Sequence, residues 1–362
     1  MKTLVVFFPS IESGGVEKNF YYLINNFSSK YKKIIIITSS KIKKNLFDKK
    51  IKFLKPKISF WENKSRFIKS IICFFLGLRL FTKKNKIILS FQSSIIAIIL
   101  SKLLRCKIII RLNTSPEKYI NTYLKKKFFY FFYKLSSEIV VNSFQFKKSL
   151  KKIFNLDSYV IYNSIGLPKK IIKKKINFFN HYKNLKIVSI GRLTDQKDHL
   201  TLIKSLNLLN KQGIKFKLYL VGQGINYYKI YKFIKDCNLI SSIKLAGFKN
   251  KAYEYINSAD LLILSSKYEG LPNVLLEAQF LGVPIISSDC PAGPKEILMN
   301  GKAGTLYKTG NYHDLAIKIK LFIKKKTVFD KQVKFAKKNL IRFDNKIILQ
   351  KYNKILIKNF NK

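Results

Sequence analysis

The sequence contains few acidic residues and very few arginines. Its 362 residues include 71 Lys and Arg against 19 Asp and Glu, and the formal net charge is +52. Only six of the bases are arginines, at positions 66, 79, 105, 111, 192 and 342. A protein that reads nucleic acid is expected to use more arginine, because the planar guanidinium suits phosphates and guanine edges. We therefore expect no nucleic acid partner. Solvated lysine is the first explanation of the charge, and attraction to an anionic membrane surface is the second.

Cysteines and long apolar runs are also scarce. The four cysteines form no C-x-x-C pair and no metal-ligand spacing, which is typical of free thiols in a reducing cytosol. The chain has no stretch of 18 uncharged apolar residues, so we expect no membrane-spanning helix. The apolar run at the N-terminus is too short for a signal peptide and predicts a strand instead. These absences favour a cytoplasmic protein.

Apolar, β-rich segments alternate with longer, helix-like segments along almost the whole chain. Strands are expected at residues 3–8, 33–38, 87–91, 107–112, 138–142 and 159–162, and again at 186–190, 215–221, 242–246, 261–265 and 284–288. Nearly continuous apolar strands separated by helices predict parallel sheets that are covered on both faces. The expected fold class is therefore α/β, with two doubly wound parallel-sheet domains whose ligand sites face an interdomain cleft.

The lysine-rich segment 164–184 interrupts this alternation and predicts a linker. We expect an N-terminal domain at 1–163 and a second domain at 185–340. The remaining residues, 341–362, predict a C-terminal helix that could pack back on the N-terminal domain.

Two strand-to-helix turns carry groups that suit phosphate. Gly14 and Gly15 follow the first strand, where their N–H groups could face an anion at a helix start. An ordinary turn would need glycine there as well. Arg192 and Lys197 follow the first strand of the second domain and can converge on a diphosphate, as a planar fork and a point charge.

A third turn contains Gly222 and Gly224 after another expected strand. Tyr227 stands where a dinucleotide-binding motif would place its third glycine, so the motif is incomplete. The pair predicts a tight turn that could still line a nucleotide pocket.

The most informative motif runs from Glu269 to Glu277. Pro272 and Asn273 predict a helix start, which places Glu269 in the preceding loop and Glu277 on the first turns. Carboxylates accept hydrogen bonds from sugar hydroxyls, and N–H groups at a helix start donate to phosphate or sugar oxygens. The combination predicts a site for a nucleotide-activated sugar, and the alternative is a capped surface helix with incidental acids. Residues 251–300 also hold three lysines against six acids, in contrast to the rest of the chain.

These motifs together resemble glycosyltransferase family 4, the retaining transferases of the GT-B fold, whose two Rossmann-like domains face a cleft. The resemblance spans nearly the whole chain and rests on Gly14-Gly15-Val16-Glu17, on Gly191-Arg192 with Lys197, on Val221-Gly222 with Gly224, and on Glu269-Gly270 through Pro272-Asn273 to Glu277-Ala278. Its members include transferases of hexoses and N-acetylhexosamines in bacterial surface-polysaccharide assembly, such as that of lipopolysaccharide or capsule.

The resemblance implies a role for each motif. Arg192 and Lys197 would hold the donor diphosphate, Glu277 the ribose hydroxyls and Glu269 the donor sugar. The implied catalytic residues are Glu269, Arg192 and Lys197. The implied donor site comprises Gly14, Gly15, Arg192, Lys197, Gly222, Gly224, Glu269, Gly270, Leu271, Pro272, Asn273, Val274 and Glu277. The chain has no D-x-D motif, so we expect no metal and no other cofactor, with side chains and helix dipoles stabilising the leaving diphosphate.

One departure from the family concerns histidine. Many relatives carry a histidine near the donor sugar in the N-terminal domain, whereas the three histidines here, at 181, 199 and 313, all lie later. Arg111 and Asn113 occupy about that place after an expected strand, and they are candidates for sugar or phosphate contacts or for plain loop structure. We expect His199 to lie on a helix surface.

Two segments combine apolar residues with bases. Lys64–Lys84 contains a run of apolar residues flanked by bases, and Lys125–Lys134 places aromatic residues beside lysines. Both fit a helix that lies in the interface of an anionic membrane. Both equally fit helices whose apolar faces cover the sheet.

The sequence therefore predicts a retaining, metal-independent glycosyltransferase. Its donor would be a nucleotide-diphosphate sugar, such as UDP-hexose or UDP-N-acetylhexosamine, and its acceptor a glycan, in particular a lipid-linked glycan. It would act in the cytoplasm, peripherally on the inner face of the cytoplasmic membrane. The alternatives are a GT-B-like sugar-nucleotide epimerase or hydrolase, and a non-catalytic protein that binds polyanions.

Overall fold

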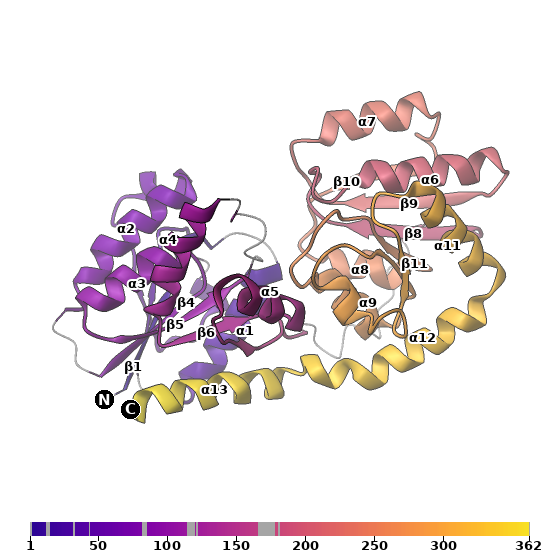
Figure 1. Ribbon diagram of the computed structural model, residues 1–362. Helices are drawn as coiled ribbons and strands as arrows, with labels where there is room; N and C mark the ends of the chain where they lie inside the picture. The colour runs from indigo at the N-terminus through magenta and orange to yellow at the C-terminus, as the bar shows by residue number, and fades with distance from the viewer. Residues whose placement is uncertain are drawn as a thin grey trace. The chain divides into compact units, whose positions relative to one another are not determined.

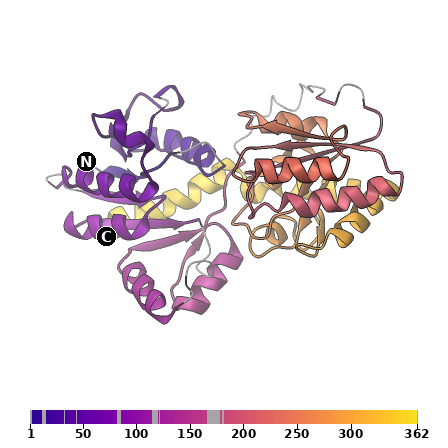
Figure 2. The ribbon, with the colours of Figure 1, turned by 90° about the horizontal axis from the view of Figure 1, so that it is seen from above.

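The computed structural model describes residues 2–11, 15–31, 33–42, 44–81, 85–113, 120, 122–165, 178–179 and 182–361. Most of the expected linker 164–184 lies outside these residues, as does Gly14. The chain divides into two compact units, Met1–Gly166 with Phe343–Lys362, and Leu167–Arg342 (Figure 1). The C-terminal helix α13 (Asn345–Asn361) therefore belongs to the first unit, as Figure 2 shows from above.

The first unit contains a seven-stranded parallel sheet in the order β3-β2-β1-β4-β5-β6-β7. Its strands are β1 (Thr3–Phe7), β2 (Lys33–Ile37), β3 (Ile51–Leu54), β4 (Lys86–Ser90), β5 (Lys107–Leu112), β6 (Glu138–Val141) and β7 (Tyr159–Val160). The strand order reverses between β1 and β4, which is where doubly wound sheets bind ligands. In register, Val5 of β1 lies opposite Ile35 of β2 and Ile88 of β4, all three buried.

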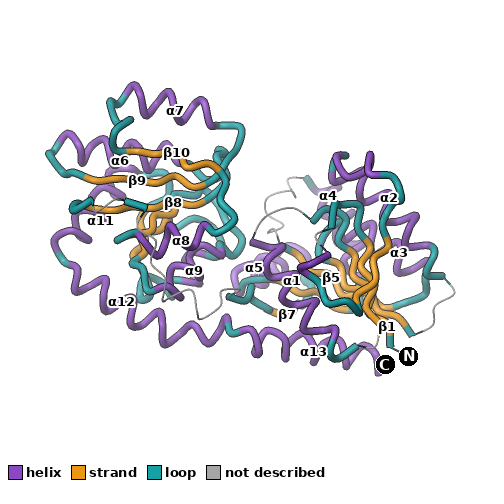
Figure 3. Tube along the Cα trace, turned by 180° about the vertical axis from the view of Figure 1, so that it is seen from behind, coloured by secondary structure: helices purple, strands orange, loops and turns teal. Residues whose placement is uncertain are grey.

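Helices cover this sheet on both faces. They are α1 (Gly15–Ser28), α2 (Arg66–Leu78), α3 (Ser94–Leu103), α4 (Tyr123–Lys134) and α5 (Phe144–Phe154), with short 3-10 turns η1 (Lys44–Leu46) and η2 (Ser59–Asn63). One buried cluster joins Val5 and Phe7 of β1 to residues of α2, α3, α4 and α5, so these four helices share a face. Helices α1 and α13 lie near each other in the first unit (Figure 3), and the ring centroids of Phe27 on α1 and Tyr352 on α13 are 6.2 Å apart.

The second unit repeats the arrangement with six parallel strands in the order β10-β9-β8-β11-β12-β13. The strands are β8 (Leu185–Ile190), β9 (Phe216–Val221), β10 (Ile243–Gly247), β11 (Leu261–Leu264), β12 (Ile285–Ser288) and β13 (Thr305–Tyr307). The helices are α6 (His199–Lys211), α7 (Tyr227–Asp236), α8 (Ala252–Ser258), α9 (Asn273–Leu281), α10 (Pro294–Ile297), α11 (Tyr312–Lys324) and α12 (Lys326–Asn339), and the 3-10 turn η5 (Leu340–Phe343) follows. Here the order reverses between β8 and β11.

The structure adds two strands that the sequence pattern did not predict, β3 and β13. Both lie at an edge of their sheet and have only four and three residues. Edge strands are buried on fewer sides, so they need no continuous apolar run; β3 indeed carries the exposed Lys52. The apolar pattern located all the central strands, which neighbours cover on both sides, and also the edge strands β7 and β10.

Candidate active site

The point where strand order reverses in the second unit brings two distant loops together. Lys197 lies in the loop after β8, and Glu269 lies in the loop after β11, 72 residues later. Their side chains form an ion pair with Nζ and Oε1 2.5 Å apart, and these side chains are only 15% and 8% exposed. A carboxylate and an ammonium are thus held at the carboxyl end of the two central strands, the usual ligand position of such sheets.

Neighbouring serines fix both members of this pair. Ser266 donates its hydroxyl hydrogen to Oε1 of Glu269 at 2.6 Å, so the same oxygen accepts two hydrogen bonds. Ser265 donates to the backbone carbonyl of Lys197 at 2.8 Å. Hydrogen bonds that leave a carboxylate in one orientation prepare it for a ligand without further reorganisation. The two loops therefore present a pre-oriented anion and cation.

Further hydrogen bonds, from side chains and from the backbone, connect the same loops. The side-chain amide of Gln196 donates to the carbonyl of Tyr268 at 3.0 Å, and the N–H of Lys267 donates to the carbonyl of Gln196 at 2.8 Å. Ser288, at the end of β12, donates to the carbonyl of Ser266 at 2.6 Å. The carboxyl ends of β8, β11 and β12 are thereby connected by hydrogen bonds, and we call these connected strand ends the rim.

Glycines allow the loops to approach at van der Waals distance. Gly222 has φ +155°, and a Cβ on it would lie 1.9 Å from the carbonyl oxygen of Gly191. A Cβ on Gly224 would lie 2.4 Å from the carbonyl oxygen of Leu193. Gly191 is itself covered by the side chain of Lys197, 3.1 Å from a Cβ position. These glycines are needed for loop packing, and a direct contact of Gly222 and Gly224 with a nucleotide stays a prediction.

The start of α9 lies in the same rim. The helix begins at Asn273 with Pro272 as the preceding cap residue, which has no side-chain acceptor for the first N–H groups. Glu277 stands in the second turn and Val274 in the first, both partly exposed. The positive end of the helix dipole therefore lies at Asn273, three residues after Gly270. A Cβ on Gly293 would lie 1.9 Å from the carbonyl oxygen of Gly270, so only glycine fits there. The site combines a helix start with two acids and a lysine.

Arg192 completes the set of charged groups near this rim. It follows β8 directly and is exposed. Within the described part of the chain, no carboxylate pairs with its guanidinium. Unlike Lys197, it could bind an incoming anion without first breaking an ion pair.

Two further titratable side chains are buried beside the ion pair. His199 is only 3% exposed, which contradicts the expected surface position: it is the first residue of α6 and its ring is turned inward. Burial lowers the pKa of His199 to about 4, and the nearby charge of Lys197 acts in the same direction. Burial raises the pKa of the Cys290 thiol to about 12. Both groups are neutral near pH 7, so the buried charges here are those of Lys197 and Glu269.

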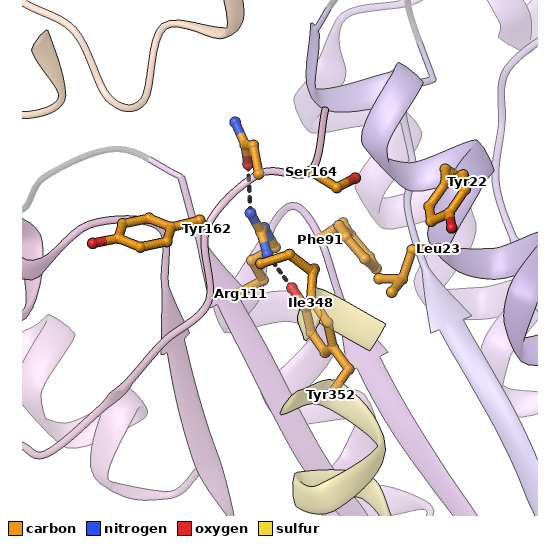
Figure 4. A pocket seen from close by; sticks show the side chains of 9 residues that line it. Tyr22, Leu23, Phe91, Arg111, Tyr162, Ser164, Ile348 and Tyr352 are labelled. Atoms are coloured by element: carbon orange, nitrogen blue, oxygen red, sulfur yellow. Dashed lines mark hydrogen bonds between the residues drawn. The ribbon is translucent and has the colours of Figure 1, made fainter. Parts of the chain in front are cut away.

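The first unit places its candidates differently. Gly15 begins α1, as the sequence predicted, whereas Gly14 lies outside the described residues. Arg111 is 5% exposed, at the end of β5. Its guanidinium donates to Tyr352 Oη of α13 and to Asn163 Oδ1 at 2.7 Å (Figure 4). It also donates to Asn113 Oδ1 at 3.1 Å. A contact of Arg111 or Asn113 with a sugar or phosphate stays a prediction, while their contacts within the chain are structural.

The narrow pocket around Arg111 is lined mainly by the protein's own apolar and aromatic groups. Phe91 and Tyr352 face the guanidinium, with ring centroids 6.0 and 5.8 Å from its central carbon (Figure 4). Asn113 also donates to the carbonyl of Phe91 at 3.1 Å. Each described partner of this buried cation is uncharged.

Several residues of the rim escaped the sequence reasoning. They are Ser265, Ser266, Ser288, Gln196 and Gly293. The serines stand at the carboxyl ends of apolar strands, and that position is the signal that could have identified them. Gly293, with φ +68°, gives no comparable signal because its need for glycine arises from the distant carbonyl of Gly270.

Comparison with known proteins agrees with this geometry. Residues 169–341, which lie in the second unit, match the family described as "Glycosyl transferases group 1". The chain is 36% identical over 116 residues to the amylovoran biosynthesis glycosyltransferase AmsD of Erwinia amylovora, covering 32% of each chain. It is 29% identical over 129 residues to a Campylobacter jejuni protein, the N-acetylgalactosamine-N,N'-diacetylbacillosaminyl-diphospho-undecaprenol 4-alpha-N-acetylgalactosaminyltransferase, covering 36% of this chain and 34% of that protein. The chain thus spans about a third of the length of these curated relatives.

Solved structures resemble the whole chain. HepE of Anabaena in complex with UDP superposes with a TM-score of 0.79 at 18% identity, over 99% of this chain and 100% of that one. A glycosyltransferase of Rickettsia africae gives a TM-score of 0.76 at 19% identity, over 100% and 99%. These likenesses confirm the expected fold class, two Rossmann-like parallel-sheet domains of the GT-B type.

Among the residues that the structure describes, no group of three or more His, Cys, Asp or Glu side chains could hold a metal ion. None of the helices that the structure describes is long and apolar enough to cross a membrane.

Proposed function

We propose that this protein is a glycosyltransferase that takes a sugar from a nucleotide-diphosphate donor. The observation that carries the proposal is the Lys197–Glu269 pair beside the start of α9. A cation, a helix start and carboxylates suit a diphosphate and sugar hydroxyls together. UDP as the nucleotide is supported by HepE, which is similar in fold and was solved with UDP and with UDP-glucose.

The proposed donor site assigns one part of the donor to each group. The exposed Arg192 and the ammonium of Lys197 bind the diphosphate, and the carboxylate of Glu277 binds the ribose hydroxyls. As Lys197 turns to the diphosphate, Glu269 accepts hydrogen bonds from the donor sugar while Ser266 keeps it in place. The Lys197–Glu269 ion pair would thus be replaced by two contacts with the donor, one from Lys197 to the diphosphate and one from the sugar to Glu269.

The reaction follows from that arrangement. The acceptor hydroxyl attacks the anomeric carbon, the bond from that carbon to the diphosphate oxygen breaks, and the hydroxyl proton passes to the leaving diphosphate. The cations and the helix dipole stabilise the charge that develops on the leaving group. Retention of configuration and independence of a metal are proposed from the resemblance to glycosyltransferase family 4.

A lipid-linked glycan is the acceptor that we propose. The name of the similar Campylobacter jejuni enzyme includes a diphospho-undecaprenol-linked sugar, which supports this class. An acceptor of that kind would place the protein at the inner face of the cytoplasmic membrane.

A panel of nucleotide sugars tests the donor. A ligand that binds only the folded state raises the free energy of unfolding, by about 2.7 kcal/mol at a hundredfold excess over Kd, and so raises the melting temperature. We expect UDP-hexose or UDP-N-acetylhexosamine to shift the melting temperature and UDP to be released only when a glycan acceptor is added. Glu277→Ala should abolish transfer with an unchanged fold, while Glu254→Ala, at a peripheral ion pair with Lys251, should not. Donor consumption without any acceptor would instead indicate an epimerase or hydrolase.

A further inference from the structure

The outward side of α2 carries an exposed apolar stripe. Phe67, Ile71 and Phe75 follow one another at four-residue intervals and are 69%, 38% and 63% exposed. The opposite side of the helix, which includes Cys73 and Gly77, is buried against the sheet and α3. Covering the sheet therefore accounts for only one side of this apolar helix.

The helix α4 shows the same division more strongly. Its exposed stripe is Leu124, Phe128 and Phe131, which are 78%, 51% and 60% exposed. Tyr133, on the opposite side, is the buried residue among the described side chains of α4. An amphipathic helix that serves only a domain core would place these large apolar side chains inward.

The helix α3 lies between α2 and α4 and contacts both. At the first contact Gly77 meets the side chain of Leu100 so closely that a Cβ would lie 2.4 Å from it. The outward residues of α3, Ile99 and Leu103, are 38% and 50% exposed. The helices α2, α3 and α4 therefore lie next to one another over the same face of the sheet (Figure 1), and we call the set of their exposed apolar side chains the outer helical face. It consists of Phe67, Ile71, Phe75, Ile99, Leu103, Leu124, Phe128 and Phe131.

The three helices contain no acid, and six of their seven bases are exposed: Arg66, Lys102, Lys125, Lys126, Lys127 and Lys134. The seventh base, Lys69, is buried. Two lysine ammonium groups lie over exposed rings: Lys127 is 4.8 Å from the centroid of Tyr123, and Lys134 is 5.9 Å from that of Tyr130. Aromatic and aliphatic side chains interleaved with lysine are the composition of helices that lie in a membrane interface.

The positive charge of the outer helical face favours an anionic bilayer over a second copy of this chain as its partner. A second copy would bring an equally basic face against it, and like charges across an interface disfavour association. An anionic bilayer offers phosphates to the lysines and an apolar layer to the rings. We propose that the outer helical face docks the protein on an anionic lipid bilayer, with its aromatic residues at the boundary between headgroups and acyl chains. The inference deepens the proposed function, on which it rests for its purpose, because a lipid-linked acceptor must be reached at a membrane.

Flotation of the full chain with vesicles tests the proposal. We expect the protein to float with vesicles of phosphatidylcholine and phosphatidylglycerol at low salt, and to remain unbound with phosphatidylcholine alone. The double variant Phe75→Ser, Phe131→Ser should lose flotation. Ile317→Ser is the matched control, since Ile317 is 61% exposed on α11 of the second unit. Melting temperatures of all variants show that these exposed substitutions leave the fold intact.

A charge variant gives an independent readout. Each base near an anionic surface contributes about fivefold in affinity, so Lys126→Glu with Lys127→Glu should weaken binding by more than twentyfold. Lys324→Glu, on an exposed lysine of the second unit, is the control for a change in net charge. Absence of flotation, or flotation that survives both double variants, overturns the proposal. So does a dimer in sedimentation that Phe75→Ser dissociates without any binding to vesicles.

Binding of UDP-glucose to the same samples separates this inference from the proposed function. A protein that binds the nucleotide sugar without floating contradicts the docking surface alone. A protein that floats but neither binds nor consumes any nucleotide sugar contradicts the transferase alone.

Discussion

The two units share one strand order but use the carboxyl ends of their sheets differently. In the first unit, the buried Arg111 donates to neutral groups of its own chain, among them the phenol of Tyr352 on the C-terminal helix. In the second unit, Lys197 is paired with a carboxylate, and Arg192 remains exposed beside it. In the first unit, groups of the chain itself accept the hydrogen bonds of the buried cation. In the second unit, an anionic ligand can compete with Glu269 for Lys197 and can bind the exposed Arg192.

The contrast is between a structural tie in the first unit and a proposed binding site in the second. Guanidinium cannot lose its proton, so burying Arg111 requires acceptors in fixed positions, and α13 supplies one of them. Such a tie fastens the end of the chain to the first unit. In the second unit Glu269 pairs with Lys197, and in the proposed site a diphosphate takes its place. The two cations therefore predict different responses to substitution.

The largest expected effect is on catalysis. Glu269→Gln removes the negative charge that faces Lys197 and, in the proposed site, the donor sugar, and it should reduce kcat on the order of 10²–10³-fold. Steady-state kinetics with a nucleotide sugar and a glycan acceptor measure this effect. Glu254→Gln should retain the wild-type rate. Equal rates for Glu269→Gln and the wild type would contradict an active site in the second unit.

Breaking the ion pair from the other side should cost stability. Lys197→Met leaves Glu269 largely buried without its cation and should lower the free energy of unfolding by about 3 kcal/mol. The double variant Lys197→Met, Glu269→Gln should recover part of that loss. Arg192→Ala should change stability by less than about 0.5 kcal/mol, because Arg192 is exposed, but weaken UDP binding. Denaturant unfolding and calorimetric titration with UDP give the two quantities.

The pH dependence of stability should report His199. Burial lowers its pKa from the ordinary histidine value of 6.5 to about 4 in the folded state. Because the folded pKa is the lower one, the unfolded state binds the extra proton first. Stability is therefore full above pH 6.5 and declines as the pH falls to about 4, by roughly 3 kcal/mol at most.

The variant His199→Gln isolates that contribution. It should flatten the decline between pH 6.5 and 4, whereas His313→Gln, on an exposed histidine, should leave it intact. Thermal unfolding across this range is the measurement. A decline that persists unchanged in His199→Gln would assign it to other groups.

The smallest effect should come from the tie in the first unit. Tyr352→Phe removes the oxygen that accepts from Arg111 and leaves a buried donor unsatisfied, which costs about 1–3 kcal/mol. Limited proteolysis should then release the C-terminal helix sooner, without a proportional loss of transfer by the folded protein. If Tyr352→Phe instead reduced transfer as much as Glu269→Gln, the distinction between tie and binding site would fail.

Much of the fold could be predicted from the sequence. Continuous apolar runs located the central strands, and Pro272 with Asn273 located the start of α9, so that Glu269 fell in the loop and Glu277 on the helix. The short edge strands β3 and β13 were missed because they need little apolar sequence. The pairing of Lys197 with Glu269 was also missed, since it depends on the adjacency of β8 and β11.

Burial is the other property that sequence could not supply. His199 was expected on a helix surface and is buried. The two apolar-basic segments fitted either a sheet cover or a membrane interface, and the structure shows that α2 buries one apolar side and exposes the other. A helical period identifies an apolar side but says nothing of how many neighbours will cover it.

The sequence by itself determined the elements and the class of the fold, because apolar strands and helix-start residues act over a few neighbouring positions. It also placed bases and acids at the ends of the right strands. Only the tertiary structure decided which of those charges meet, which are saturated by the chain and which stay exposed. These outcomes depend on strand order and packing, which join Lys197 to Glu269 across 72 residues and Arg111 to Tyr352 across 241.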